Sequence, residues 1–311
     1  MINAVLVLDK PAAFTSHDVV NRVRRITGER SVGHLGTLDP MATGVLPLVL
    51  GRFTRLAQFF NDGLKVYEGE ICFGFATDTY DAEGEAVGPL STAYPTLRDI
   101  ERHLPALTGE IRQMPPIYSA KKINGVAAYK LARKDKPVEL KPVPVVVHRF
   151  EILSIMGSRA RFVAEVSAGT YIRSLAHDLG EALGCGAHLS QLRRTQASEF
   201  DLSQAVTLED LAKYHDTSQT AEPALNSQDE PRESQEHDRP SPYVHPRRVL
   251  TRMPSVTAAS DTLAYLNNGR AVNLPEFSDA SLVKVFADQE HLVAIVQRVA
   301  GTLFQPKIVL G

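Results

Sequence analysis

The chain has 311 residues, of which 43% are hydrophobic and 23% are charged, and its formal net charge at pH 7 is −2. This length and hydrophobic content suffice for a large core and for two domains. No apolar stretch reaches membrane-spanning length, the N-terminus lacks the basic region of a secretory signal, and the two cysteines, Cys72 and Cys185, lie far apart without metal-ligand spacing. We therefore expect a cytoplasmic protein without a membrane segment, a disulfide framework or a metal site.

The first thirty residues predict a strand and a helix. Residues 4–8 form an apolar run that is typical of a strand. Ser16 can cap the helix that follows, and Gly28 would end it. The apolar residues of this helix recur at helical spacing, at Val19, Val20, Val23 and Ile26.

A glycine-hinged segment follows at residues 31–40, with the sequence Ser-Val-Gly-His-Leu-Gly-Thr-Leu-Asp-Pro. We expect Gly33 and Gly36 to let the backbone adopt conformations that other residues disfavour, and to let a bulky partner approach it. Pro40 biases Asp39 away from helical angles, towards an extended or turn geometry. The segment therefore predicts a loop that presents a carboxylate.

Two residues of this loop could do chemistry, Asp39 and, five positions upstream, His34. An Asp-Pro pair after Gly-x-x-Gly is also an ordinary turn, and the spacing alone favours a structural turn over a catalytic loop. A phosphate-binding loop is excluded because the Lys-Ser/Thr that closes such a motif is missing. The apolar run at residues 44–51 predicts a buried segment directly after the loop.

The middle of the chain mixes predicted strands with two helices. A strand at residues 66–75 leads to a turn at residues 81–84, where Asp78 and Asp81 lack the spacing of a calcium loop. Thr96 would open a helix that ends near Gly109. Further strands are expected at residues 143–147, 152–155 and 161–166, and a helix at 171–183 with Ile172, Leu175, Leu179 and Leu183 on one face. Strands mixed with segregated helices indicate an α+β fold.

The acidic residues concentrate in one polar segment, residues 215–248. Between His215 and Pro246 there are seven acidic and two basic residues, a net charge of −5, which leaves +3 for the rest of the chain. Because this stretch has almost no large apolar residues, it cannot offset its ordering entropy, and we expect a flexible linker between domains at 1–214 and 249–311. An alternative is an acidic arm that competes with a nucleic acid for a basic surface.

The remainder of the chain carries several clusters of basic residues. Each cluster alone is more typical of a solvated helix face, but together they would suit a surface that follows nucleic-acid phosphates. The clusters lie at Arg22–Arg25, Lys121–Lys122, Lys130–Lys136, Arg193–Arg194 and Arg247–Arg248. After the acidic segment, three β-like runs at residues 281–286, 291–299 and 302–310 would fit a small barrel.

Five collinear blocks of the sequence resemble the bacterial tRNA pseudouridine synthase B (TruB) family. The central block is His34-Leu-Gly-Thr-Leu-Asp39-Pro40-x-Ala-Thr-Gly44. The others are residues 8–11 (Leu-Asp-Lys-Pro), 65–67 (Lys-Val-Tyr), 116–122 (Pro-Ile-Tyr-Ser-Ala-Lys-Lys), and 169–194 from Gly-Thr-Tyr-Ile-Arg-Ser-Leu to Leu-Arg-Arg. The resemblance implies a pseudouridine synthase fold, with a mixed, largely antiparallel sheet flanked by helices, and a small β-rich PUA-like RNA-binding domain at its C-terminus.

The resemblance also implies roles for particular residues. Asp39 would be the nucleophile, and Arg173 would pair with it and favour its charged form. Tyr67 would stack on the target base, and His34 would enter the RNA loop and hold the flipped state. Without the resemblance, His34 would be interpreted as a local hydrogen bonder and Tyr67 as a core residue. The remaining matches are Tyr171 and Leu192, which would line the uracil pocket, and Lys10 and Pro11, which would pack near the catalytic loop.

The implied reaction is the isomerisation of uridine to pseudouridine at position 55, in the T-loop of tRNA. It breaks the bond from N1 to C1′, turns the base and rejoins it through C5, so no redox cofactor or metal is required. A carboxylate suits this task as it does in retaining glycosidases, once the base has been flipped out. We expect a monomer that binds the tRNA T-arm. The alternatives are an RNA-binding tRNA folding factor that needs no catalysis, and the catalytic subunit of a guide-RNA complex.

Overall fold

The computed structural model describes residues 1–119, 121–123, 126–128, 131, 140–219 and 240–311. The expected basic cluster at Lys130–Lys136 and most of the acidic segment lie outside the described residues. No helix in the described ranges combines the length and the apolar character that crossing a membrane requires.

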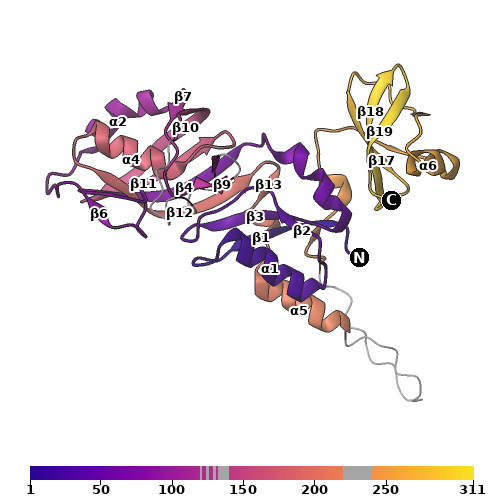
Figure 1. Cartoon of the computed structure of the whole chain (residues 1–311), viewed down its shortest axis with the longest axis horizontal. Coiled ribbons are helices and arrows are strands. Elements are labelled where there is room, and N and C mark those ends of the chain that lie inside the picture. The colour runs from indigo at the N-terminus through magenta and orange to yellow at the C-terminus, as the bar shows by residue number, and fades with distance from the viewer. Residues whose placement is uncertain (120, 124–125, 129–130, 132–139, 220–239) are drawn as a thin grey trace, which may run out of the picture.

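A ten-stranded sheet organises the larger part of the chain (Figure 1). Its order is β14-β1-β3-β12-β4-β11-β10-β7, with β2 beside β3 and β13 beside β12. Neighbouring strands are antiparallel, except that β12 and β3 are parallel, which confirms the expected mixed, largely antiparallel sheet. The strands are β1 (Ala4–Lys10), β2 (Val32–His34), β3 (Thr43–Leu50), β4 (Lys65–Phe73), β7 (Gly109–Gln113), β10 (Val143–Met156), β11 (Arg159–Val166), β12 (Ala187–Ala197), β13 (Phe200–Asp201) and β14 (Tyr243–Val244).

Both faces of β1 are buried, which explains the uninterrupted apolar run at its residues 4–8. Leu6 and Leu8 point to a core shared with the helices, whereas Val5 and Val7 point to a second core on the opposite face. Helices α1 and α5 lie side by side on the first face (Figure 1). The helices here are α1 (Ser16–Thr27), α2 (Leu97–His103), α4 (Ile172–Ala182) and α5 (Leu208–Gln219), with the 3-10 helices η1 (Gly51–Phe60), η2 (Leu104–Leu107) and η3 (Leu202–Gln204).

Three of the expected element boundaries were wrong. Thr15, and not Ser16, caps α1, because Thr15 and Asp18 exchange the hydrogen bonds of a capping box. The expected strands at 143–147 and 152–155 are one strand, β10, in which irregularities after Val147 and Ile152 shift the register without ending the pairing. Gly28 ends α1 in a left-handed conformation and Thr96 caps α2, as expected. The helix expected to end near Gly109 instead ends at His103 and is followed by a short 3-10 helix at Leu104–Leu107.

The C-terminal residues form a separate five-stranded sheet in the order β15-β17-β18-β19-β16, which confirms the expected β-rich domain. It packs on the second core through Phe286, Ile295 and Ile308. Arg55 adds a hydrogen bond to the carbonyl of Val309 at 2.7 Å. The elements are η4 (Pro246–Arg248), β15 (Ser255–Thr257), α6 (Ser260–Asn267), β16 (Val272–Asn273), β17 (Leu282–Phe286), β18 (Leu292–Ala300) and β19 (Leu303–Val309).

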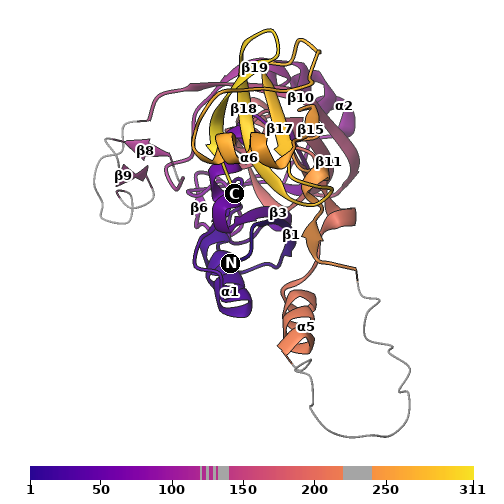
Figure 2. The same cartoon turned by 90° about the vertical axis from the view of Figure 1, so that its right-hand side faces the viewer.

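Two small ladders lie apart from these sheets, β5 (Ala76–Thr77) with β6 (Ala86–Val87), and β8 (Lys122–Ile123) with β9 (Val126–Ala127). Figure 2 shows the second ladder at the side of the molecule. Both ends of the segment that was expected to be a linker, residues 215–248, contain regular elements. Helix α5 continues to Gln219, and β14 pairs with β1, where Tyr243 and Val244 pack against the two cores. These two apolar residues are partly buried at the edge of the sheet. The polar composition of the segment as a whole gave no indication of this.

Candidate active site

Asp39 lies in the loop between β2 and β3, where the sequence predicted a turn. The amide of Ala42 donates a hydrogen bond to the carbonyl of Asp39 at 3.1 Å, so the structural turn is present and carries the carboxylate. Gly36 has a φ of +117°, which only glycine adopts readily. Gly33 lies in β2 outside the left-handed region, so the expected need for conformational freedom at Gly33 was wrong.

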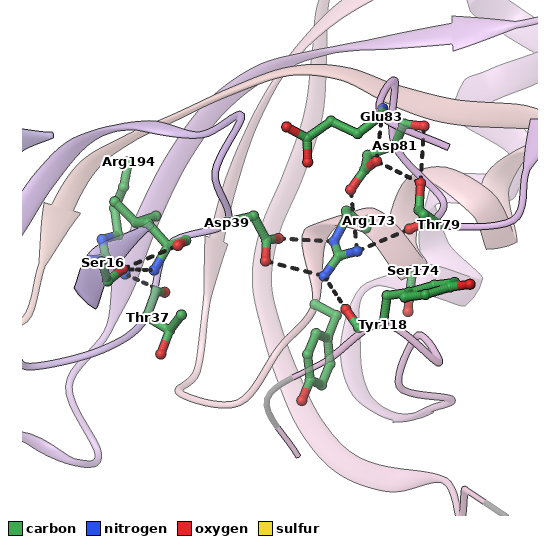
Figure 3. Close-up of polar contacts among 12 residues, drawn as sticks. Ser16, Thr37, Asp39, Thr79, Asp81, Glu83, Tyr118, Arg173, Ser174 and Arg194 are labelled. Atoms are coloured by element: carbon green, nitrogen blue, oxygen red, sulfur yellow. Dashed lines mark hydrogen bonds and ion pairs between the residues drawn. The ribbon is translucent and has the colours of Figure 1, made fainter. Parts of the chain in front are cut away.

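Two buried side chains hold the main chain of this loop (Figure 3). Ser16 accepts a hydrogen bond from the amide of Leu38 at 2.8 Å and donates one to its carbonyl at 3.1 Å. Arg194 donates from Nη2 to the carbonyl of Gly36 at 3.1 Å and from Nη1 to that of Thr37 at 3.4 Å. The residues just before Asp39 are therefore fixed from α1 and from β12.

Lys10 holds the other side of the loop. Its ammonium donates to the carbonyl of Pro40 at 3.1 Å, and also to those of Pro11 at 2.9 Å and Phe14 at 2.5 Å. The side chain is fully buried, and burial lowers its pKa to about 8, although the Asp39 carboxylate opposes this shift. Lys10 thus contacts the loop and brings a cation close to the carboxylate, whereas Pro11 is exposed and its carbonyl accepts from Lys10.

Arg173, near the start of α4, links the loop to the rest of the site. Its Nε lies 2.9 Å from Oδ2 of Asp39 and its Nη2 donates to Oδ1 at 3.2 Å. Its Nη1 lies 3.2 Å from Oδ2 of Asp81 and donates to the carbonyl of Thr79 at 3.0 Å. Nη2 also donates to the carbonyl of Tyr118 at 3.0 Å. Figure 3 shows this guanidinium between two carboxylates, so its position is fixed from several sides.

Desolvation has the largest effect on the pKa of two carboxyl groups in the site, those of Asp39 and Glu83. Burial raises the pKa of the Asp39 carboxyl; Arg173 acts to lower this pKa, and Asp81 to raise it. Burial also raises the pKa of Glu83, with Asp81 and Asp39 adding to the rise. The expected ion pair between Arg173 and Asp39 is therefore present, but it does not bring the pKa of Asp39 below its ordinary value, because the loss of water outweighs it.

A cavity of about 340 Å³ opens beside Asp39. Tyr67 from β4, Leu192 from β12, and Tyr171 and Arg173 at the start of α4 line it together with Asp39. Gln113 fixes the main chain of Tyr171 by accepting from its amide at 2.8 Å and donating to its carbonyl at 2.9 Å. Five of the predicted site residues therefore surround one cavity, although they come from four separate segments of the chain.

His34 ends β2 and is not among the residues that line this cavity. Its Nδ1 is buried, and no hydrogen-bond partner for it exists in the described part of the chain. Burial lowers the pKa of His34, and the nearby Arg194 lowers it further. The side chain is therefore neutral at neutral pH and has an unused polar atom.

Sequence reasoning missed four residues of the site. From the sequence, Asp81 is interpreted as part of a turn, Ser16 as a helix cap and Arg194 as part of a basic cluster, and Thr79 is given no role. Arg194 is instead fully buried, so its place in the expected phosphate-binding surface was wrong. Of these four residues, only Ser16 had a usable sequence signal. Thr15 stands three residues before Asp18 and forms the capping box with it, so the side chain of Ser16 is not needed as the helix cap.

The sequence matches models of one protein family. Residues 24–172 match the N-terminal domain of the TruB family of pseudouridylate synthases, and residues 173–234 match the C-terminal domain of tRNA pseudouridylate synthase B. The chain is 44% identical to a tRNA pseudouridine synthase B of Solibacter usitatus, over 99% of this chain and 100% of the relative. It is 42% identical to one of Arthrobacter sp., over 93% and 94% respectively.

Solved structures agree with this match. A chain in the structure of an H/ACA RNP bound to a substrate RNA containing 2′-deoxyuridine superposes with a TM-score of 0.69 at 25% identity, over 99% of this chain and 85% of that chain. A chain of a Cbf5-Nop10-Gar1 complex gives a TM-score of 0.66 at 26% identity, over 96% and 79%. With relatives at this identity over nearly its whole length, the chain belongs to the TruB family of pseudouridylate synthases.

Proposed function

We propose that this chain isomerises the uridine at position 55 in the T-loop of tRNA to pseudouridine, with Asp39 as the nucleophile. The observation that carries the proposal is a carboxylate held by Arg173 at the wall of a cavity that also contains two tyrosines and Leu192. Its volume of about 340 Å³ lies in the range of about 300–1,000 Å³ that is usual for small-ligand sites. The tRNA substrate follows from the relatives, which are named for this reaction.

The reaction moves one bond and transfers no net electrons. The bond between N1 and C1′ breaks, the uracil turns within the cavity, C5 bonds to C1′, and C5 loses its proton while N1 gains one. The side chains that line the cavity can bind the base, exclude water and move protons, so the proposed chemistry needs no redox group.

Asp39 is free to react because its oxygens are only partly used. Each oxygen contacts one nitrogen of Arg173, which leaves further lone pairs directed elsewhere. About a third of the side chain is exposed, whereas that of Arg173 is almost fully buried. The carboxylate can attack C1′, attack the base or remove a sugar proton, and Arg173 would stabilise it again when it departs.

The remaining residues would bind the flipped nucleotide. Tyr67, Tyr171 and Leu192 line the cavity, so the two tyrosines would stack on the uracil and Leu192 would pack against it. His34, close to the loop but outside the cavity, would enter the RNA and hold the flipped state.

The C-terminal domain, from residue 249, would contribute to binding of the T-arm, and the chain would act as a monomer. The acidic segment would serve as a linker between the two parts. Because residues 215–219 and 243–244 belong to α5 and β14, we confine this proposal to the residues between them.

The test is to incubate the purified chain with an unmodified tRNA transcript and to map pseudouridine by position. We expect modification at position 55, and Asp39→Asn is expected to abolish it while the dissociation constant for tRNA stays within about twofold. Asp62→Asn, which changes an exposed carboxylate elsewhere, is the matched control. Full activity of Asp39→Asn, or modification at another position only, would refute the proposal.

The same experiment separates the two alternatives. A folding factor would still refold tRNA as the Asp39→Asn variant, so refolding is measured beside modification. A subunit that depends on a guide RNA would be inactive when purified alone. The structural neighbours in H/ACA complexes are the observation that keeps this second alternative in view.

A further inference from the structure

Tyr80 and His177 form a stacked pair next to the Arg173 contacts. Their ring centroids are 3.8 Å apart and the planes are inclined by only 8°. Tyr80 lies in the loop between β5 and β6, and His177 lies in α4, four residues after Arg173. Residues four apart share one face of a helix, so the stack joins the loop to the face of α4 that carries Arg173.

The loop residues on either side of Tyr80 are those that hold Arg173. Thr79 offers its carbonyl and Asp81 its carboxylate, and both contact the same atom, Nη1 of Arg173. Tyr80 itself has a φ of +65°, a left-handed conformation that a bulky residue adopts rarely. This sharp turn of the chain at Tyr80 lets both of its neighbours face a single guanidinium.

Such a conformation persists only where the surroundings hold it. The main chain of Tyr80 is held at both ends, since its amide donates to the carbonyl of Thr77 at 3.2 Å and its carbonyl accepts from Leu189 at 3.0 Å. The stack on His177 holds the side chain. Burial lowers the pKa of His177, so at neutral pH the tyrosine ring packs on an uncharged imidazole.

We propose that the Tyr80–His177 stack positions Arg173, and through it Asp39, for the reaction. Neither ring lines the cavity, so both are positioning residues and not catalytic ones. The stack keeps Thr79 and Asp81 against Nη1, which fixes the guanidinium that holds the carboxylate. The expected effect of the stack on the reaction rate rests on the proposed function. Its expected effect on the position of the Arg173 guanidinium does not.

The test uses variants that separate the ring from the backbone turn. Tyr80→Gly removes the ring and permits the left-handed conformation, so the loop is expected to fold. Tyr80→Phe keeps the ring without the hydroxyl group. His177→Ala removes the other half of the stack, and Tyr94→Ala removes a half-exposed ring elsewhere as the matched control. For each variant, the single-turnover rate and the dissociation constant for a tRNA transcript are measured separately.

We expect Tyr80→Gly and His177→Ala to lower the single-turnover rate on the order of tenfold, because displacements of about 1 Å can cost up to a hundredfold. The dissociation constant should stay within about twofold, the double variant should be no slower than either single one, and Tyr80→Phe and Tyr94→Ala should match the unmodified chain. The proposal would be overturned if Tyr80→Gly reacted at the full rate, or if only the dissociation constant changed. It would also be overturned if Tyr80→Phe were as slow as Tyr80→Gly.

A second measurement needs no RNA. The Nε–H resonance of Arg173 in an NMR spectrum reports the environment of the guanidinium directly. We expect it to shift in Tyr80→Gly and His177→Ala and to stay in place in Tyr80→Phe and Tyr94→Ala. An unchanged resonance in Tyr80→Gly would overturn the proposal, whereas absence of tRNA modification by the unmodified chain would contradict only the proposed function.

Discussion

The guanidinium of Arg173 contacts both carboxylate oxygens of Asp39, through Nε at 2.9 Å and through Nη2 at 3.2 Å. The arginine is the fixed member of this pair, because Asp81 and the carbonyls of Thr79 and Tyr118 occupy its remaining donors. Among the described residues, Asp39 has no comparable set of side-chain partners, and it lines the cavity. The pair thus combines a rigid cation with an accessible anion, which suits a nucleophile that must leave and return.

Arg173→Lys is expected to slow the reaction by about a hundredfold or more, since removal of one positioned donor from an active site typically costs 10²–10³ in rate. A lysine keeps the charge but cannot contact Asp39 with two nitrogens while it also reaches Asp81. Single-turnover kinetics on a tRNA transcript measure this loss. Arg159→Lys, at an exposed ion pair with Glu70, is the control; equal rates for the two variants would contradict the argument.

Asp81→Asn is expected to move the acid limb of the pH–rate profile to lower pH. The proposed mechanism needs Asp39 in its ionised form, so the rate is expected to rise with pH as that carboxyl loses its proton. Since the charge of Asp81 raises the pKa of Asp39, its removal lowers this pKa and shifts the midpoint downward. The maximal rate should fall as well, because Arg173 loses one partner. Profiles are recorded between pH 4 and 8.

The matched control for this change is Asp78→Asn, in the same loop. Asp78 is exposed, and its carboxylate accepts from the amide of Glu85 without contacting Arg173. We expect its midpoint to coincide with that of the unmodified chain. A midpoint for Asp81→Asn that stays in place or moves upward would show that Asp81 does not act on the pKa of Asp39.

Local sequence signals predicted the elements of the fold more completely than the contacts of the site. The helices at 16–27 and 172–182 follow from apolar residues at helical spacing, because one face of each must be buried. Nothing local encodes the contact between Asp39 and Arg173, which are 134 residues apart in sequence. The pair was predicted only from the family resemblance. Residue types and their spacing alone do not indicate which distant residues come into contact.

Arg193 and Arg194 illustrate why the remaining site residues escaped prediction. As neighbours in a strand, they point to opposite faces of the sheet. Arg193 pairs with Asp9 at 2.7 Å and is partly exposed, whereas Arg194 is fully buried under the Asp39 loop. Two identical adjacent residues give no sign of which one lies inside, because that depends on strand register and on the loop packed above it.

Arg194→Met is expected to destabilise the protein by about 3 kcal/mol or more and to slow the reaction. Methionine fills much of the volume but leaves the carbonyls of Gly36, Thr37 and Val45 without their donor, and each unsatisfied buried group costs about 1–3 kcal/mol. Arg193→Met is the adjacent control, since a partly exposed ion pair contributes only about 0–1 kcal/mol. Urea unfolding measures both free energies, and similar values for the two variants would count against a role of Arg194 in holding the loop.

Lys10→Met is expected to reveal the cost of a buried ammonium through the pH dependence of stability. Burial lowers the pKa of Lys10 to about 8 in the folded state, whereas an unfolded lysine titrates near 10.4. Between these values the unfolded state binds more protons, so the free energy of unfolding rises with pH. Below pH 8 both states are protonated, and the full cost of burial is present.

The unmodified chain should therefore gain up to about 3 kcal/mol of stability relative to Lys10→Met between pH 8 and pH 10.5, at about 1.4 kcal/mol for each unit of the pKa difference. Taking the difference between the two proteins cancels the contribution of Lys65, whose pKa burial also lowers to about 8. Urea unfolding followed by circular dichroism across this range measures it. Lys141→Met, at an exposed lysine, shows how far a methionine substitution alone changes the slope. A difference that stays constant with pH would mean that the Lys10 ammonium carries no burial cost, and that its three carbonyl acceptors compensate it fully.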